Sequence, residues 1–273
     1  MSSPGDTATG DQPQRVVHDT TRKSPKRLAR TAGVIYLLIA VFGGFAQGFL
    51  QPKMYVPGDA AATTENVVAN ETLMRLGIVS DLVNEVLLVL LALTLYALLK
   101  HVHIAAARAM VALAILAAGI TALNAVFEFA GLQVATGAVD MSAIGVDGSD
   151  SMVLLMLDTQ HYGLLIAQIF FGLWLAPLAY LAYQSGWFPK LLTLVLAVAA
   201  GCYLVDVFTA FLAPDLNQLI HGFITVPCII AEIWMAGYLV TVGVNTKRSM
   251  KAKPPVIGAF AGDSAGASTS GVR

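Results

Sequence analysis

Six long apolar runs constrain the fold of this chain more than any other feature of its sequence. Each run is longer than the roughly 20 mainly apolar residues that an α-helix needs to cross the hydrocarbon core of a membrane. Only 12% of all residues are charged, about half the share that is typical of soluble domains. We therefore predict an all-α membrane protein, a bundle of six transmembrane helices. The predicted spans are residues 28–50, 73–99, 105–132, 156–183, 188–212 and 218–241.

Both ends of the chain are polar and lack such runs. Residues 1–27 hold Pro, Ser, Thr, Gly and charged residues, and residues 244–273 are rich in Gly, Ser and Ala. Segments of this composition cannot bury enough apolar surface to fold. We therefore predict a disordered tail over residues 1–27, a transmembrane domain over residues 28–243, and a second disordered tail over residues 244–273.

Lys and Arg are sorted along the chain by the connection in which they lie. Both tails and two of the predicted connections are basic, the connection over residues 51–72 has Lys53 alone against three acids, and residues 131–151 have three Asp and no Lys or Arg. Cytoplasmic flanks of membrane proteins carry an excess of Lys and Arg. We therefore predict cytoplasmic N and C termini in the cell membrane, that is, the plasma or inner membrane. The basic residues of that side are Arg22, Lys23, Lys26, Arg27, Arg30, Lys100, Arg108, Lys190, Lys247, Arg248, Lys251 and Lys253.

Polar and ionisable side chains recur on single faces of the predicted spans, at spacings of three and four residues. Ionisable groups inside a membrane are costly and indicate functional sites by default. The depth of each group in the membrane can be counted from the end of its span at a rise of about 1.5 Å per residue. By this count the polar and ionisable side chains lie in the outer half of the bundle and around its midplane. This distribution predicts a cavity that opens to the outside. The candidate proton- or ligand-binding residues are Asp81, Asn84, Glu85, Asn124, Glu128, Asp158, His161, Asp206, His221 and Glu232.

The first span differs from the others because small residues form one of its faces. Ala40, Gly43 and Gly44 share this face. Small residues let two membrane helices approach closely. We therefore expect another helix to pack tightly against this face.

Acidic groups outnumber basic groups within the spans. The available bases are Arg75 near the outer mouth, His161 and His221. A buried carboxylate must be paired, hydrogen-bonded or protonated. The excess of acid therefore predicts bound protons, a cation, or a small cationic or hydrogen-bonding ligand, as in a transporter-like or ligand-binding protein. The six acids are Asp81, Glu85, Glu128, Asp158, Asp206 and Glu232.

Two other functions remain open from the sequence. In the first, His161, His221 and carboxylates hold a divalent metal in an intramembrane enzyme. The spacing of a His-Glu-x-x-His pair is missing, so we predict no cofactor. In the second, the polar groups only hold the helices together in a non-catalytic structural or assembly protein. The sequence shows no nucleotide-binding loop, serine-nucleophile elbow or redox cysteine pair, which favours a non-enzymatic protein. We predict that its partners are the lipid bilayer and a small ligand, and that it does not bind nucleic acid.

Several short stretches resemble a known family in their order along the chain. They are Arg30-Thr-Ala-Gly-Val-Ile-Tyr-Leu-Leu-Ile, Val56-Pro-Gly-Asp-Ala, Arg75-Leu-Gly-Ile-Val-Ser-Asp-Leu, His161-Tyr-Gly, Phe170-Phe-Gly-Leu-Trp, Ser185-Gly-Trp-Phe-Pro-Lys and Glu232. Together they resemble the prokaryotic multi-pass membrane family known as domain of unknown function 4386, over about residues 28–243. The resemblance implies a helical integral protein of the cell membrane. It brings no established activity and no catalytic residue.

Overall fold

The computed structural model describes residues 24–245, and the regular structure within this range is helical. Most of the two predicted tails lies outside the described residues. The elements are α1 (Pro25–Gly43), the π-helix η1 (Gly44–Leu50), α2 (Gln51–Met54), α3 (Ala60–Ala69), α4 (Glu71–Leu99), α5 (Ile104–Ala135), the 3-10 helix η2 (Ser142–Ile144), α6 (Gly145–Ser185), α7 (Lys190–Leu212) and α8 (Pro214–Thr241).

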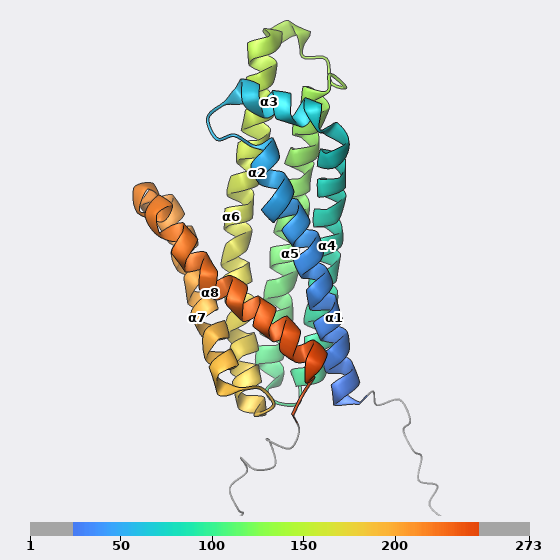
Figure 1. Cartoon of the computed structure of the whole chain (residues 1–273), viewed down its shortest axis with the longest axis vertical. Coiled ribbons are helices and arrows are strands. Elements are labelled where there is room, and N and C mark those ends of the chain that lie inside the picture. The colour runs from blue at the N-terminus through green and yellow to red at the C-terminus, as the bar shows by residue number, and fades with distance from the viewer. Residues whose placement is uncertain (1–23, 246–273) are drawn as a thin grey trace, which may run out of the picture.

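Six helical stretches are long and apolar enough to cross a membrane, as the sequence predicts. The first of them joins α1, η1 and α2 into one stretch, and α4, α5, α6, α7 and α8 provide the others. Figure 1 shows that α1 begins and α8 ends at the same end of the bundle. We call this the terminal end, and the opposite one the far end. The structure thus confirms the all-α membrane fold, while the cytoplasmic placement of the termini stays a prediction.

The helix boundaries differ from the sequence prediction most in α6, which begins at Gly145 and not near residue 156. At about 1.5 Å per residue this helix is roughly 60 Å long, twice the hydrocarbon thickness of about 30 Å. Its first turns therefore extend beyond the apolar span. Asp147 in the first turn favours helix there because carboxylates stabilise the positive end of the helix dipole.

The short helix α3 lies across the far end of the bundle (Figure 1). Asp59 caps its N-terminus by accepting a hydrogen bond from the amide of Ala62 at 3.0 Å. The Thr63 hydroxyl accepts a hydrogen bond from the backbone amide of Val56 and donates one to its carbonyl, and Val67 is fully buried. The connection between α2 and α4 is therefore a packed cover for this end.

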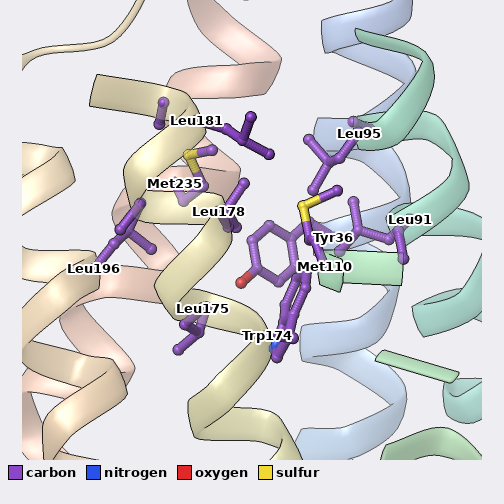
Figure 2. Packing of buried hydrophobic residues seen from close by; sticks show 14 of the residues in the cluster. Tyr36, Leu91, Leu95, Met110, Trp174, Leu175, Leu178, Leu181, Leu196 and Met235 are labelled. Carbon is purple, nitrogen blue, oxygen red and sulfur yellow. The ribbon is translucent and has the colours of Figure 1, made fainter. Parts of the chain in front are cut away.

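Two hydrophobic clusters fill the interior at different heights. The first cluster lies toward the terminal end and joins α1, α4, α5, α6, α7 and α8; Figure 2 shows its centre, where Tyr36, Met110 and Trp174 meet the leucines of α6. The second cluster lies toward the far end. It consists of Leu50, Met54, Val67, Met74, Ile78, Ala125, Leu132, Val153 and Leu157.

The helix α8 approaches α1 closely only near the terminal end. A Cβ atom added at Gly33 would lie 2.6 Å from the backbone nitrogen of Val240. Farther along, Gly44 would have no atom within 4 Å of an added Cβ. The predicted tight packing against the face of Ala40, Gly43 and Gly44 is therefore wrong for Gly44, because α8 diverges from α1 above Gly33. Gly43 does meet a neighbour, the amide of Asn84, at 3.3 Å.

Candidate functional site

A pocket of about 530 Å³ lies in the centre of the bundle. Residues of α1, η1, α4, α5, α6, α7 and α8 line it. This volume falls within the range of roughly 300–1,000 Å³ that is usual for small-molecule sites. The predicted candidates Asp81, Asn84, Glu85 and Glu232 are all part of its lining.

Asp81 is buried in the wall that α4 provides. Its Oδ2 accepts a hydrogen bond of 2.7 Å from the side-chain amide of Gln47. Gln47 belongs to the π-helix between α1 and α2. Short π-helical turns are frequent at functional sites, and here the turn contributes the side chain that donates to Asp81.

Glu85 lies one turn farther along α4 and is only 4% exposed. Its Oε1 accepts a weak hydrogen bond of 3.3 Å from the amide of Asn84. Its Oε2 is buried without a hydrogen-bond partner among the described residues, as is Oδ1 of Asn84. Across the pocket, the side-chain oxygen of Gln168 is likewise unpartnered. The pocket thus presents acceptor oxygens that no donor of residues 24–245 satisfies.

Glu232 of α8 lines the pocket opposite α4. The hydroxyl of Tyr203 on α7 donates to its Oε1 at 2.9 Å. The hydroxyl of Tyr36, which is 3% exposed, is also buried in the pocket lining and has no partner in the described part of the chain. In Figure 2 its ring points away from α1 into the interior, toward α6.

Asn124 and Glu128 lie on α5 close to the pocket, although neither lines it. Asn124 packs against Gly163 of α6, where an added Cβ would lie only 2.1 Å from its Oδ1. Glu128 is buried and lies within electrostatic range of Asp81. One oxygen of Glu128 and the amide nitrogen of Asn124 have no hydrogen-bond partner within the described range. These two residues belong to the interface of α5 with its neighbours.

Asp158 and His161 form a second group, nearer the far end. Oδ1 of Asp158 accepts a hydrogen bond of 2.5 Å from the hydroxyl of Tyr55, just after α2. The ring of His161 stacks on Tyr55 at 5.6 Å between centroids. Burial, and then the hydrogen bond to Asp158, raise the pKa of Tyr55 above its ordinary value. This group therefore ties the end of the first span to α6.

Asp206 and His221 form a third group, at the tip of the α7–α8 hairpin. Nδ1 of His221 lies 2.8 Å from Oδ1 of Asp206, and Asn217 donates to the same oxygen at 2.9 Å. Asp206 is 4% exposed and the His221 side chain 53% exposed. The histidine thus covers the carboxylate on its outer side.

The pocket opens sideways, between α1 and α8. Its exposed lining residues are Leu37, Ala40 and Gly44 on α1 and η1, and Ile229 and Ile233 on α8. The first hydrophobic cluster separates the pocket from the terminal end, and the second separates it from the far end. The exposed part of the lining thus lies between α1 and α8, and apolar side chains of the second cluster lie between the pocket and the far end. That the cavity opens to the outside stays a prediction.

The family of the chain can be decided from its sequence match. A family model described as domain of unknown function (DUF4386) matches residues 31–243. The chain belongs to this family. No curated protein and no solved structure matches it. The DUF4386 match includes every residue that lines the pocket and every candidate residue of the three groups.

The metal alternative gains no support from the geometry of this DUF4386 domain. Within residues 24–245, no three His, Cys, Asp or Glu side chains are placed so that they could hold a metal ion. His161 stacks on Tyr55, while His221 is paired with Asp206. The predicted set of His161, His221 and a carboxylate is therefore not assembled.

The DUF4386 domain provides few cations near its buried acids. The two ion pairs of the described chain are Arg75–Glu71 and His221–Asp206, both at 2.8 Å. Arg75 is thus paired with Glu71 and does not line the pocket. Asp81, Glu85 and Glu232 have no Lys, Arg or His within ion-pair distance among residues 24–245.

Five polar residues of the DUF4386 domain that contribute to these groups were missed in the sequence. They are Tyr36, Gln47, Tyr55, Tyr203 and Asn217. Gln47 could have been found, since it is the one amide side chain of the predicted first span, residues 28–50. The tyrosines give no such signal, because tyrosine is also common as an interface anchor and as a packing residue in membrane helices.

Proposed function

We propose that this DUF4386 protein resides in the cell membrane, with its terminal end in the cytoplasm, and binds a small ligand in its central pocket. The ligand carries a positive charge or hydrogen-bond donors. The observation that supports this proposal most is Glu85, which lines the pocket and whose Oε2 is buried without a hydrogen-bond partner in the described chain. Burial of an unpaired polar group is costly, and a donor or cation from a ligand removes that cost.

The charge balance of the pocket supports the same conclusion. Asp81, Glu85 and Glu232 line it without a neighbouring cation among residues 24–245. A cation in a site of low dielectric is attracted to carboxylates much more strongly than in water. Ionisable side chains that face the interior of a membrane bundle generally serve ligand or ion pathways. Transport would further require that one hydrophobic cluster parts, so binding is the step that this geometry supports best.

A second candidate function is a structural one, and specific hydrogen bonds favour it. Gln47 joins the first span to α4 through Asp81, and Tyr203 joins α7 to α8 through Glu232. Such bonds stabilise membrane bundles by about 0.6 kcal/mol each on average. In this alternative the protein is a non-catalytic assembly partner, and the pocket has no ligand.

Thermal unfolding of the purified protein tests the two functions against each other. Tetramethylammonium chloride serves as the cation probe, compared with sodium chloride at equal ionic strength. A ligand at 100 times its Kd stabilises the folded state by about 2.7 kcal/mol. We expect tetramethylammonium to raise the Tm of the wild type and of the control Glu65→Gln, an exposed acid of α3, but not of Glu85→Gln.

The same experiment can contradict the proposal in two ways. An equal rise in all three proteins would show that the probe acts outside the pocket. No rise in the wild type, together with a lower Tm of Glu85→Gln without the probe, would favour the structural function.

A further inference from the structure

The position of the pocket mouth limits the route by which a ligand can arrive. Counted from Arg30 at about 1.5 Å per residue, Leu37 lies roughly 10 Å and Gly44 roughly 21 Å along the helix axis. Counted back from Thr241 in the same way, Ile233 and Ile229 lie about 12 and 18 Å along α8. The hydrocarbon core of a bilayer is about 30 Å thick. The mouth therefore lies at the depth of the lipid chains.

The rim and the floor of the pocket differ in chemistry. The rim consists of the exposed apolar side chains Leu37, Ile229 and Ile233 together with Ala40 and the glycine at position 44. The floor holds the buried carboxyls of Asp81 and Glu85 on α4. A molecule that fits both parts has an apolar section next to the lipid and a cationic group at its inner end.

We propose that the ligand is a single-chain amphiphilic amine or ammonium compound that enters from the bilayer between α1 and α8. Its cationic head lies among Asp81, Glu85 and Glu232, and its alkyl chain passes between Ala40 and Ile233 toward the lipid. This inference rests on the proposed function and adds the class of ligand and its route.

The open contacts around Gly44 support this route. An added Cβ there meets nothing within 4 Å, so the space between η1 and α8 is free for a chain. Because hydrophobic clusters close both ends of the pocket, the side mouth is also the route that displaces no packed side chain. The three carboxyls without a cationic neighbour in the described range supply the charge complementarity.

Binding to the full-length protein in phosphatidylcholine nanodiscs tests the inference. The probes are dodecyltrimethylammonium, which has the chain, and tetramethylammonium, which has only the head; empty nanodiscs correct for partitioning into lipid. Each CH₂ of the chain that leaves water for the apolar rim favours binding. We therefore expect dodecyltrimethylammonium to bind at least tenfold more tightly after this correction. Glu85→Gln should lose both probes.

A substitution at the mouth separates the route from the site. Ala40→Trp should weaken the binding of dodecyltrimethylammonium at least tenfold and change the affinity for tetramethylammonium by no more than about threefold. Its neighbour Val41, 65% exposed and outside the pocket lining, provides the control Val41→Trp, which should change neither. Ile233→Trp narrows the mouth from α8 and replaces Ala40→Trp if that variant does not fold.

The outcomes distinguish this inference from the proposed function. If both probes bind with equal affinity and neither mouth variant has an effect, the lateral route is overturned while the proposed function stands. If neither probe binds the wild type, both are overturned. If Val41→Trp weakens dodecyltrimethylammonium as much as Ala40→Trp does, the chain lies on the outer surface of α1 and the proposed route is wrong.

Discussion

Tyr203 and Glu232 are joined by a hydrogen bond of 2.9 Å that links α7 to α8 inside the pocket. The bond occurs at the height where α8 has already diverged from α1. It therefore holds the α8 wall of the mouth from behind. Glu232 thus links the two helices of the α7–α8 hairpin and also adds a carboxyl group to the pocket lining.

Replacement of Tyr203 by phenylalanine removes this bond without changing the ring. We expect Tyr203→Phe to lower the free energy of unfolding by about 0.6–1.7 kcal/mol, the range of measured interhelical hydrogen bonds in membranes. Unfolding in a series of sodium dodecyl sulfate concentrations measures the change. Tyr162→Phe, at an exposed position of α6, is the control, and an equal loss there would contradict the role of the bond.

The contact of Gly163 with Asn124 predicts a steric effect between α5 and α6. A methyl group at Gly163 would lie 2.1 Å from Oδ1 of Asn124. Overpacking of this kind costs about 1–3 kcal/mol, so Gly163→Ala should destabilise the protein by that amount. Gly119→Ala, where an added Cβ meets nothing within 4 Å, should not.

A double variant checks the cause of that loss. Asn124→Ala makes room for the new methyl group and should recover stability in the Gly163→Ala background, as a coupled pair requires. If the two losses simply add, the clash is not the cause.

The bond between Tyr55 and Asp158 predicts a dependence of stability on pH. The pKa of Tyr55 is raised on folding, by burial first and by the hydrogen bond second. A raised pKa means that this contribution is complete below the ordinary tyrosine pKa of about 10 and is lost as the pH rises toward the higher folded value. The Tm difference between the wild type and Tyr55→Phe should therefore be constant up to about pH 9 and shrink above it. A constant difference at pH 11 would contradict the assignment.

Spin labels can show which medium reaches the mouth. Labels at positions 40 and 233 should collide with oxygen, which concentrates in lipid, more often than with a water-soluble nickel chelate. A label at position 140, in the connection before η2, should show the reverse order. Preference for the chelate at position 40 would favour an opening to water. The native Cys202 and Cys228 are first replaced by Ala, since both are free thiols.

The six spans could be predicted because a membrane requires a long apolar run, and such runs are visible in a single sequence. The face that Asp81 and Glu85 share could be predicted for the same reason, since periodicity determines which residues of one helix lie together. Periodicity does not say which neighbour a face meets. The candidates therefore fall into separate groups around Glu85, Asp158 and Asp206, where one shared cluster was expected.

The apolar closure of the far end could not be predicted from the sequence. Leu50, Ile78 and Leu157 are among the residues that close it. Apolar residues occur throughout every span, so the sequence does not show which of them pack against one another. The start of α6 was predicted too late because its first turns are polar and lie before the apolar run that marks the span.

The walls of the mouth come from the first and the sixth span, so nearly the whole domain separates them in sequence. A ribosome synthesises the α1 wall early and the α8 wall last. Until α8 has inserted, Asp81 and Glu85 lack the helix that forms the other side of their pocket. Ligand binding would accordingly report that a chain has been inserted from end to end.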